Sequence, residues 1–410
     1  MKDIVERFLS YIAIDTTSSE ETDTTPSTPN QFILADQLAD ELKELGVKDV
    51  YRDEHAFVYG TVPGNLPYTC DTVGFLAHMD TSNAASGLNV KAKIIENYDG
   101  KDIVHDCGLV TSVNEYPQIA ELKGKTIIVT DGNTLLGADD KAGIAIIMDF
   151  IQRLVENPDI PHGDIKVCFT PDEEIGIGIE KINLDHFVCD YAFTMDGGTV
   201  NDVNYENFNA ATAVVTVTGN SIHPGSAKGK MINACQVLMD YHALLPVFQR
   251  PEFTENREGF NHMVQMEGTC EHAQSIYIIR NHDRVEFENQ KALFKECERH
   301  INEMYGKQIC VADVHDTYKN MKEEFKDRMY IIDLASKAIE KEGYVTTYTP
   351  IRGGTDGAKL TFKGLLTPNL GTGGMFYHGP HELLCVEDMK EMVNIVENVV
   401  RLTAERKKEA

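Results

Sequence analysis

Residues 73–80 read Val-Gly-Phe-Leu-Ala-His-Met-Asp, a short apolar run that ends abruptly at His78 and Asp80. Three later apolar runs are also followed closely by acidic residues, at 126–130, 165–170 and 191–195. Short runs of this kind are typical of buried strands in a parallel or mixed sheet. Because ligands bind beyond the carboxyl ends of such strands, the polar residues that follow them mark the expected functional edge.

Helical periodicity surrounds these runs. Helices are expected at 4–12, 32–45, 142–154, 330–341 and 386–406, and a further strand at 344–349. Residues 142–154 would form one crossover between strands. A sheet with helices packed on it is an α/β domain. The sequence therefore predicts an α/β fold whose mixed central sheet is flanked by helices.

The middle of the chain has a different pattern. Strand-like alternation at 213–218, 263–269, 275–280 and 310–315 is interrupted by helical periodicity at 231–245 and 285–305. The resulting order, βαββαβ, is that of the ferredoxin-like unit. We therefore expect one discontinuous α/β domain, 1–208 and 319–410, interrupted by a smaller α+β domain at 209–318.

The composition argues against some classes of binding partner. The chain has 410 residues and a formal net charge of −27, which repels the phosphates of nucleic acids and of anionic membranes. The longest apolar runs fall far short of a membrane helix, and the N-terminus lacks a secretory signal pattern. The nine cysteines are scattered without a Cys-x-x-Cys pair, which favours reduced thiols. We therefore expect a cytoplasmic protein that binds neither nucleic acid nor membrane.

Two histidines and several carboxylates could carry chemistry. They follow apolar runs or lie at loop-to-helix junctions: His78, Asp80, Asp139, Asp140, Glu173, Glu174, Asp196 and His378. A single carboxylate at such a position is usually only a helix cap, but a buried ion costs several kcal/mol unless it is paired or binds metal. The set suits two zinc ions that share one carboxylate. Spacing alone leaves open both this choice and which aspartate is shared.

Neighbouring polar residues in these motifs could have different roles, one as a metal ligand and the other as an orienting group or a general base. Asp80 and His78 point the same way from an extended segment, so Asp80 could hold the second imidazole nitrogen of His78. Glu173 and Glu174 diverge at a strand terminus, where one could bind metal while the other faces a metal-bound water as general base. Metal-assisted hydrolysis requires both a metal ligand and a general base near the same water, and two adjacent glutamates can supply them.

Four stretches carry a resemblance to a known superfamily: 74–81 (GFLAHMDT), 136–143 (LGADDKAG), 170–176 (TPDEEIG) and 377–382 (YHGPHE). The chain resembles the dizinc aminoacylase/carboxypeptidase metallopeptidase superfamily, and over essentially its whole length it is similar to the tripeptide aminopeptidases within it. Further support comes from 161–165, 205–211, 223–229 and 351–357. The resemblance implies a zinc-exopeptidase-like catalytic α/β domain interrupted by a ferredoxin-like α+β lid.

The resemblance also implies a role for each residue of the site. Five side chains would bind two Zn²⁺ ions per subunit: His78, Asp139 and Asp196 one ion, and Asp139, Glu174 and His378 the other. Asp139 would bridge the ions, and the peptide bond after this aspartate is often cis in relatives. Asp80 would orient His78, and Glu173 would take the proton of a metal-bridging water. His381 and Glu382 compete with His378 on sequence alone, but the order of the motif favours His378.

Three residues would bind the substrate by the same resemblance. His223 would hydrogen-bond the scissile carbonyl oxygen as it gains charge. Arg280 and Arg352 would clamp the substrate carboxylate bidentately. An ordinary surface ion pair is the alternative for either arginine.

The implied function is that of a zinc metallo-aminopeptidase that hydrolyses the N-terminal residue from tripeptides, with Glu173 as general base. The same metals would also serve a dipeptidase, a carboxypeptidase or an N-acyl amino acid deacylase, and Co²⁺ or Mn²⁺ would fit the same ligands. A non-enzymatic alternative is a peptide-binding or metal-storage protein. The expected partners are small peptide substrates, and the resemblance allows a homodimer through the inserted domain.

Overall fold

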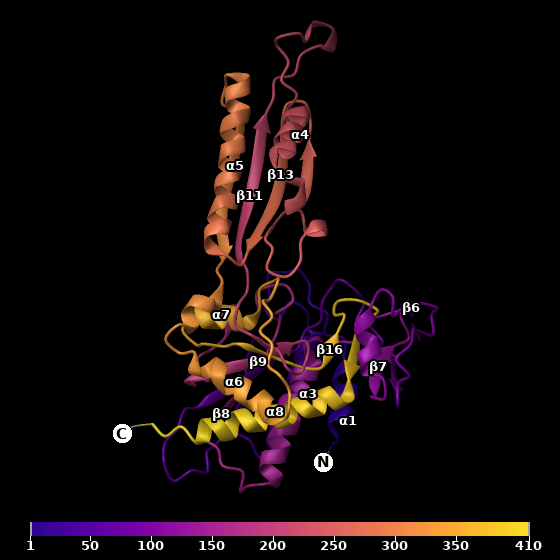
Figure 1. Cartoon of the computed structure of the whole chain (residues 1–410), viewed down its shortest axis with the longest axis vertical. Helices are drawn as coiled ribbons and strands as arrows, with labels where there is room; N and C mark the ends of the chain where they lie inside the picture. Colours follow the sequence, from indigo (N-terminus) through magenta and orange to yellow (C-terminus); the bar gives the residue numbers. More distant parts are fainter. Residues whose placement is uncertain (1, 409–410) are drawn as a thin grey trace. The chain divides into compact units, whose positions relative to one another are not determined.

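The computed structural model describes residues 2–408, and the chain divides into two compact units (Figure 1). Unit 1 comprises the chain up to Tyr205, Glu324–Tyr348, and everything from Thr355 onward. Unit 2 comprises Glu206–Glu323 and Thr349–Gly354. Both units are thus built from separate segments, whereas the sequence predicts one discontinuous domain interrupted by a continuous one.

Residues 349–354 account for the main difference in boundary. The sequence assigns them to the α/β domain, whereas the structure places them in unit 2. The N–H of Ile351 donates to the carbonyl of Glu206 at 2.8 Å, and the Arg352 side chain donates to the carbonyl oxygens of Asn256 and Glu258. Such long-range contacts leave no periodicity in the sequence, and they hold this segment in unit 2.

The core of unit 1 is a seven-stranded mixed sheet. Its order is β1 (Lys48–Arg52), β2 (Val58–Val62), β8 (Ile165–Thr170), β3 (Val73–His78), β9 (Tyr191–Gly197), β15 (Asn369–Gly371) and β10 (Val203–Asn204). The central strands β8, β3, β9 and β15 run parallel, and the outer pairings are antiparallel. Every residue of β3 is buried, as expected for a strand covered on both faces. The predicted mixed α/β fold is confirmed.

The α-helices of unit 1 pack on this sheet or on one another. They are α1 (Ile4–Ile12), α2 (Asn30–Glu44), α3 (Ala138–Glu156), α6 (Tyr330–Lys341), α7 (Asp356–Phe362) and α8 (Val386–Ala404). The helix α3 contacts β3 and β9 and packs between α1 and α8. Gly143 permits this contact, because a Cβ atom there would overlap the carbonyl oxygen of Met195. The start of α3 therefore lies close to the ends of the central strands.

A separate four-stranded antiparallel sheet contains one of the predicted strands. Its order is β16 (Gly374–Met375), β17 (Leu383–Cys385), β7 (Ile127–Thr130) and β4 (Ala92–Ile95). The apolar run at 126–130 is thus a strand, but it does not join the main sheet as expected. All four residues of β7 are buried, so its pattern is the same as that of a central parallel strand. A short hairpin pairs β5 (Ile103–Val104) with β6 (Val110–Thr111).

The strand expected at 344–349 is not formed. This segment makes one isolated bridge, between Thr347 and Asp202. Val345 is 82% exposed, and no strand pairs alongside it in the described part of the chain. The β-branched residues favour an extended backbone here, but a strand also needs a partner.

Unit 2 has the predicted βαββαβ order. The elements are β11 (Asn209–Thr218), α4 (Ala234–Leu244), β12 (Phe260–Gly268), β13 (His272–Asn281), α5 (Arg284–Tyr305) and β14 (Cys310–Tyr318). Its antiparallel sheet has the order β12-β13-β11-β14, and α4 and α5 run along the strands in Figure 1. The buried residues of β11, such as Ala213, Val215 and Val217, belong to a core shared with these helices. Unit 2 therefore has a hydrophobic core of its own.

Short 3₁₀ helices complete the described structure: η1 (Pro117–Leu122), η2 (Gly178–Lys181), η3 (Pro224–Ser226), η4 (Val247–Gln249), η5 (Pro251–Phe253) and η6 (Met321–Phe325). The cis peptide bond that the resemblance implies after Asp139 is present. A search of residues 2–408 finds no helix with the length and apolar character needed to cross a bilayer.

Candidate metal centre

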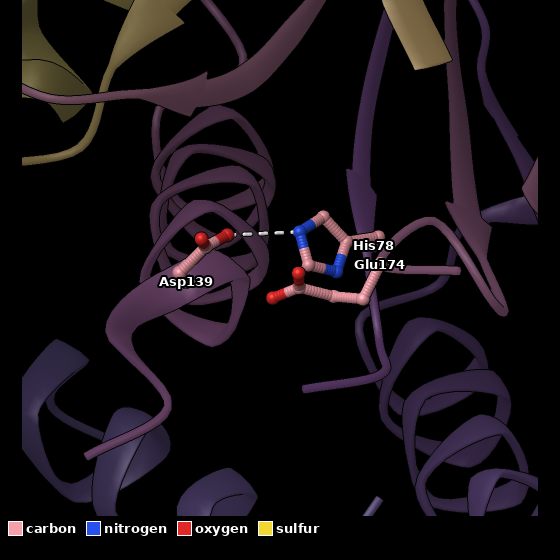
Figure 2. Close-up of side chains that lie close together, drawn as sticks. All are labelled: His78, Asp139 and Glu174. Atoms are coloured by element: carbon pink, nitrogen blue, oxygen red, sulfur yellow. Dashed lines mark hydrogen bonds and ion pairs between the residues drawn. The ribbon is translucent and has the colours of Figure 1, made fainter. Parts of the chain in front are cut away.

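Three predicted ligands from separate elements of unit 1 lie together (Figure 2). His78 ends β3, Asp139 begins α3, and Glu174 lies in the loop after β8. One potential ligand atom from each residue lies within 4.8 Å of those of the other two. The ends of two parallel strands and one helix therefore form the site, as the sequence pattern predicts.

Asp139 lies between two histidines. Its Oδ1 is 2.9 Å from Nε2 of His78, and its Oδ2 is 3.1 Å from Nε2 of His378. Asp196 Oδ1 lies 3.6 Å from the same nitrogen of His78, and Glu174 Oε2 lies 3.0 Å from that of His378. Each histidine thus has one further carboxylate, and Asp139 is common to both groups.

Asp140 is an alternative ligand that spacing could not exclude. It forms a second compact group with His78 and Asp196. One of its oxygens accepts the backbone N–H of His78 at 3.2 Å, and burial raises its pKa well above the usual value. Of these two adjacent aspartates, Asp139 is the one whose carboxylate lies against both histidines, so the geometry favours Asp139 as the shared carboxylate.

Asp80 contacts both His78 and the loop that carries the glutamates. Nδ1 of His78 lies 3.0 Å from the carbonyl oxygen of Asp80 and 3.3 Å from its Oδ1. Because a carbonyl oxygen only accepts, Nδ1 carries a proton, and Nε2 of a neutral ring is then free to bind metal. The Asp80 carboxylate also accepts the N–H groups of Glu173 and Glu174, at 3.0 and 3.1 Å. Asp80 therefore orients three residues of the site.

The electrostatics of the site are those of crowded buried acids. Burial raises the pKa of Asp196 to about 7 and that of Glu174 above its usual value. Burial opposes ionisation of Asp139, but hydrogen bonds to His378 and His78 hold its pKa below the usual value. The bonds to Asp139 and Glu174 raise the pKa of His378 to about 10. Protonated histidine is therefore the counter-ion of these carboxylates when no cation is bound.

The donor set fits divalent metal ions. Two imidazoles and several carboxylates without cysteine are ligands that Zn²⁺ binds well. One oxygen of Glu174 and one of Asp140 are buried without a hydrogen-bond partner among the described residues. Buried carboxylate oxygens that lack a donor are costly unless a cation or a proton satisfies them. The residues present thus suit a metal centre.

Glu173 lies beside this cluster. Burial raises its pKa well above the usual value, and the neighbouring Asp196 carboxylate acts in the same direction. A carboxylate with a raised pKa is a stronger base than an ordinary glutamate. The electrostatics are compatible with the role that the resemblance implies for Glu173.

The three expected substrate-binding residues belong to unit 2, whereas the cluster belongs to unit 1. His223 is exposed, and its Nδ1 accepts the N–H of Gly225 at 3.1 Å. Arg280 donates to the carbonyl oxygens of Ala211 and Ile279 and lies over the ring of Tyr318. The side chain of Arg352 lies over two rings, those of Phe208 and Phe260, and donates to Thr254 as well as to two carbonyl oxygens.

The two residues that compete with His378 have other partners. His381 is half-buried, and its Nδ1 lies 2.8 Å from Oγ1 of Thr111. Glu382 is almost fully buried, and its carboxylate accepts backbone N–H groups of the segment that leads into Asp139. The order of the motif thus agrees with the geometry, since His378 is the residue at the cluster. The sequence alone did not predict this contact of Glu382. Glu382 is marked in the sequence only by its position, four residues after His378.

Two family descriptions match parts of the chain. The peptidase dimerisation domain matches residues 205–308, which include most of unit 2. The M42 glutamyl aminopeptidase description matches residues 87–229. Neither match spans half of the chain, but both agree with the fold and the metal cluster in defining a metallopeptidase.

The relatives extend over the whole chain. Peptidase T from Clostridium novyi is 46% identical over 404 residues, which are 98% of this chain and 99% of that protein. The chain therefore belongs to the peptidase T family, and the resemblance to aminopeptidases that the sequence suggests is confirmed.

Solved structures share the fold. The aminopeptidase PepT from Bacillus cereus has a TM-score of 0.77 at 23% identity, with 98% of each chain covered. A tripeptidase from Staphylococcus aureus has a TM-score of 0.76 at 20% identity and the same coverage. A dinuclear metal binding peptidase of the M20 family from Bacillus subtilis has a TM-score of 0.61 at 15% identity, also with 98% of each chain covered. These three likenesses establish the fold.

Proposed function

We propose that this peptidase removes the N-terminal residue from tripeptides and that it uses two zinc ions. The observation that carries the proposal is the position of Asp139, whose two oxygens approach His78 and His378 separately. A carboxylate shared in this way is what a pair of metal ions requires. The similar tripeptidase and dinuclear metal binding peptidase support the substrate and the metal number.

Five residues would hold the metals: His78, Asp139, Asp196, Glu174 and His378. The metals, when bound, would supply Lewis acidity and a water of lowered pKa. Three carboxylates offset most of the charge of two divalent ions, which limits the cost of burying them. Asp80 keeps the His78 ring in the tautomer whose Nε2 can bind metal.

Glu173 would act as the general base. Its raised pKa suits a group that takes a proton from the attacking water and then returns it to the leaving amine. The hydrogen bond from its N–H to Asp80 holds the backbone of Glu173 against the segment of His78. The base is thereby fixed relative to the metal ligands.

His223, Arg280 and Arg352 would bind the substrate. The exposed His223 would donate to the scissile carbonyl oxygen as negative charge develops there. The two arginines would hold the C-terminal carboxylate of the peptide, which favours short substrates. Arg352 now donates to two carbonyl oxygens, so it would exchange these contacts for the substrate.

A panel of peptides tests the proposal. Metal-loaded protein is compared on a free tripeptide, its N-acetylated form, a dipeptide and a tetrapeptide, with Glu173→Gln as control. We expect release of the first residue from the free tripeptide alone, and a loss of about 10²–10⁴-fold in kcat in the variant. Hydrolysis of the acetylated form or the dipeptide would move the protein to another specificity. Full metal binding without cleavage would favour a peptide-binding protein.

We also propose a homodimer through unit 2. Among residues 2–408, the strand β12 pairs only with β13, so its other edge presents N–H and C=O groups without a strand partner there. Val264 and Met266 of β12 are 49% and 40% exposed, and Met239 of the neighbouring α4 is 47% exposed. A second copy of the edge would cover these apolar side chains and extend the sheet.

Light scattering tests this interface. Val264→Glu should convert the dimer to a monomer, because it places a charge in the apolar edge. Val311→Glu is the matched control, since Val311 is 55% exposed on β14, the opposite edge strand. Dissociation by the control but not by Val264→Glu would place the interface on β14 instead.

The cytoplasmic location is also a proposal. All nine cysteines are free, and five of them are buried. Reduced thiols are typical of a reducing compartment. Fractionation of cells that produce the protein tests this, and recovery outside the cytoplasm would contradict it.

A further inference from the structure

Glu382 has no role in the function proposed above, yet its carboxylate accepts three hydrogen bonds beside the candidate metal ligands. Its Oε2 accepts the N–H groups of Leu136 and Gly137 at 2.6 and 2.9 Å, and its Oε1 accepts that of Asp139 at 3.1 Å. The side chain is 1% exposed, so water does not replace these bonds. A buried carboxylate with three backbone donors is held in one orientation.

These bonds join two segments that are far apart in the sequence. Glu382 follows His378 in the same turn, where its N–H donates to the carbonyl oxygen of Gly379 at 3.2 Å. Its carboxylate holds the segment that ends in Asp139, some 243–246 residues away. His378 and Asp139 approach each other to 3.1 Å. Glu382 therefore connects the backbones that carry two ligands of one metal.

The start of α3 makes a carboxylate suitable here. The N-cap residue of α3 is Gly137, which offers no side chain to satisfy the free N–H groups of the first turn. Glu382 supplies an acceptor from another part of the chain. It accepts the N–H of Asp139 at the start of α3 and those of Leu136 and Gly137 just before the helix, and its negative charge interacts favourably with these donors. The substitution Glu382→Gln would keep the shape of the side chain, but the new NH₂ group would face at least one backbone N–H.

We propose that Glu382 is a positioning residue, which sets the separation of Asp139 and His378 and thereby the affinity and geometry of the metal site. The inference rests on the proposed metal centre. Glu382 itself does not touch the metal or the substrate. Outer contacts of this kind typically change metal affinity by about 10–100-fold when removed.

Titration of the metal-free protein with Co²⁺ tests the inference without an activity assay. We expect Glu382→Gln to raise the dissociation constant for Co²⁺ by about 10–100-fold and to change the visible absorption of the bound ion. The matched control is Glu387→Gln, since Glu387 accepts the N–H of Thr126 at 2.8 Å at the far end of β7. The control should match the wild-type protein in affinity and spectrum.

The outcomes separate this inference from the proposed function. A wild-type protein that binds no Co²⁺ would overturn the metal centre itself. A Glu382→Gln protein with wild-type affinity and spectrum would overturn only the role of Glu382. If this variant does not fold, hydrogen exchange of the wild-type protein decides, because the N–H groups of Leu136 and Gly137 should be protected. Rapid exchange of both groups would contradict the inference.

Discussion

Asp80 shows how one carboxylate can serve several residues of a site. Its two oxygens accept the N–H groups of Glu173 and Glu174, and one of them also lies 3.3 Å from Nδ1 of His78. Asp80→Asn would place an NH₂ group against at least one of these donors. We expect kcat to fall by about 10–100-fold and metal affinity to fall as well. Steady-state kinetics and metal titration check this, and unchanged values in both would contradict it.

His282 lets the stability of unit 2 depend on pH. Burial lowers its pKa to about 4, and its ring stacks on Phe208. Glu206, Arg257 and Arg352 are the charged groups that act on the ring, and neither ring nitrogen has a hydrogen-bond partner among the described residues. An unfolded histidine has a pKa of about 6.5, so between these two values the unfolded state binds the extra proton. Stability from the neutral ring is therefore complete above pH of about 6.5 and is lost as the pH falls.

The matching variant is His282→Phe, which keeps an aromatic ring beside Phe208 but cannot titrate. We expect the wild-type protein to lose more unfolding free energy than the variant when the pH is lowered from about 7.5 to 5. Denaturant unfolding at the two pH values measures the difference. Equal losses would show that the pKa of His282 is the same in the folded and the unfolded state.

At the scale of elements, α2 is joined to the loop that carries the glutamates. Asp172 accepts the N–H of Ser27 at 2.7 Å and the side-chain NH₂ of Gln31 at 2.6 Å. Gln31→Ala would leave this buried carboxylate with fewer donors, which we expect to lower the unfolding free energy by about 1–3 kcal/mol. It should also lower kcat, since Glu173 follows Asp172 directly. Gln37→Ala on the same helix removes a side chain that donates to Oγ of Ser10 at 3.3 Å, away from the glutamate loop, and should have little effect on kcat.

The local elements could be predicted better than their partners. The apolar run at 73–77 and the helical spacing at 285–305 correspond to β3 and α5, because burial leaves a continuous apolar run in one and an apolar stripe in the other. The run at 126–130 is also continuously apolar but pairs with β4 and β17, and the segment at 344–349 has no full strand partner among the described residues. Periodicity reports burial and local backbone, but it does not report which strand lies alongside.

At the candidate site, too, residue types could be predicted from the sequence but contacts between distant segments could not. Motif resemblance singled out five residues that lie together in unit 1, because ligand chemistry restricts the residue types: His78, Asp139, Glu174, Asp196 and His378. It also singled out His223, Arg280 and Arg352, which belong to unit 2. Spacing could not separate Asp139 from Asp140, since only side-chain direction distinguishes adjacent residues. The contacts of Glu382 and of Gln31 join segments more than 100 residues apart, and no local pattern encodes them.

At the scale of the whole molecule, the two units have separate cores. The core of unit 2 contains residues of β11, β13, α4 and α5, whereas the cores around Phe57 and around Ile127 lie in unit 1. A unit with its own hydrophobic core can unfold as a unit of its own. The candidate metal ligands all belong to unit 1. Metal binding should therefore stabilise one unit and leave the other unchanged.

Scanning calorimetry with and without a chelator tests this separation. Each metal ion, at about 100 times its dissociation constant, should stabilise unit 1 by about 2.7 kcal/mol, because only the folded site brings the five ligands together. The bound metal also relieves the repulsion among Asp139, Glu174 and Asp196, which acts in the same direction. We expect one thermal transition to move to lower temperature when the metal is removed, while a second, from unit 2, keeps its Tm. A single transition that shifts as a whole would show instead that the two units unfold together, so that the metal site stabilises the entire chain.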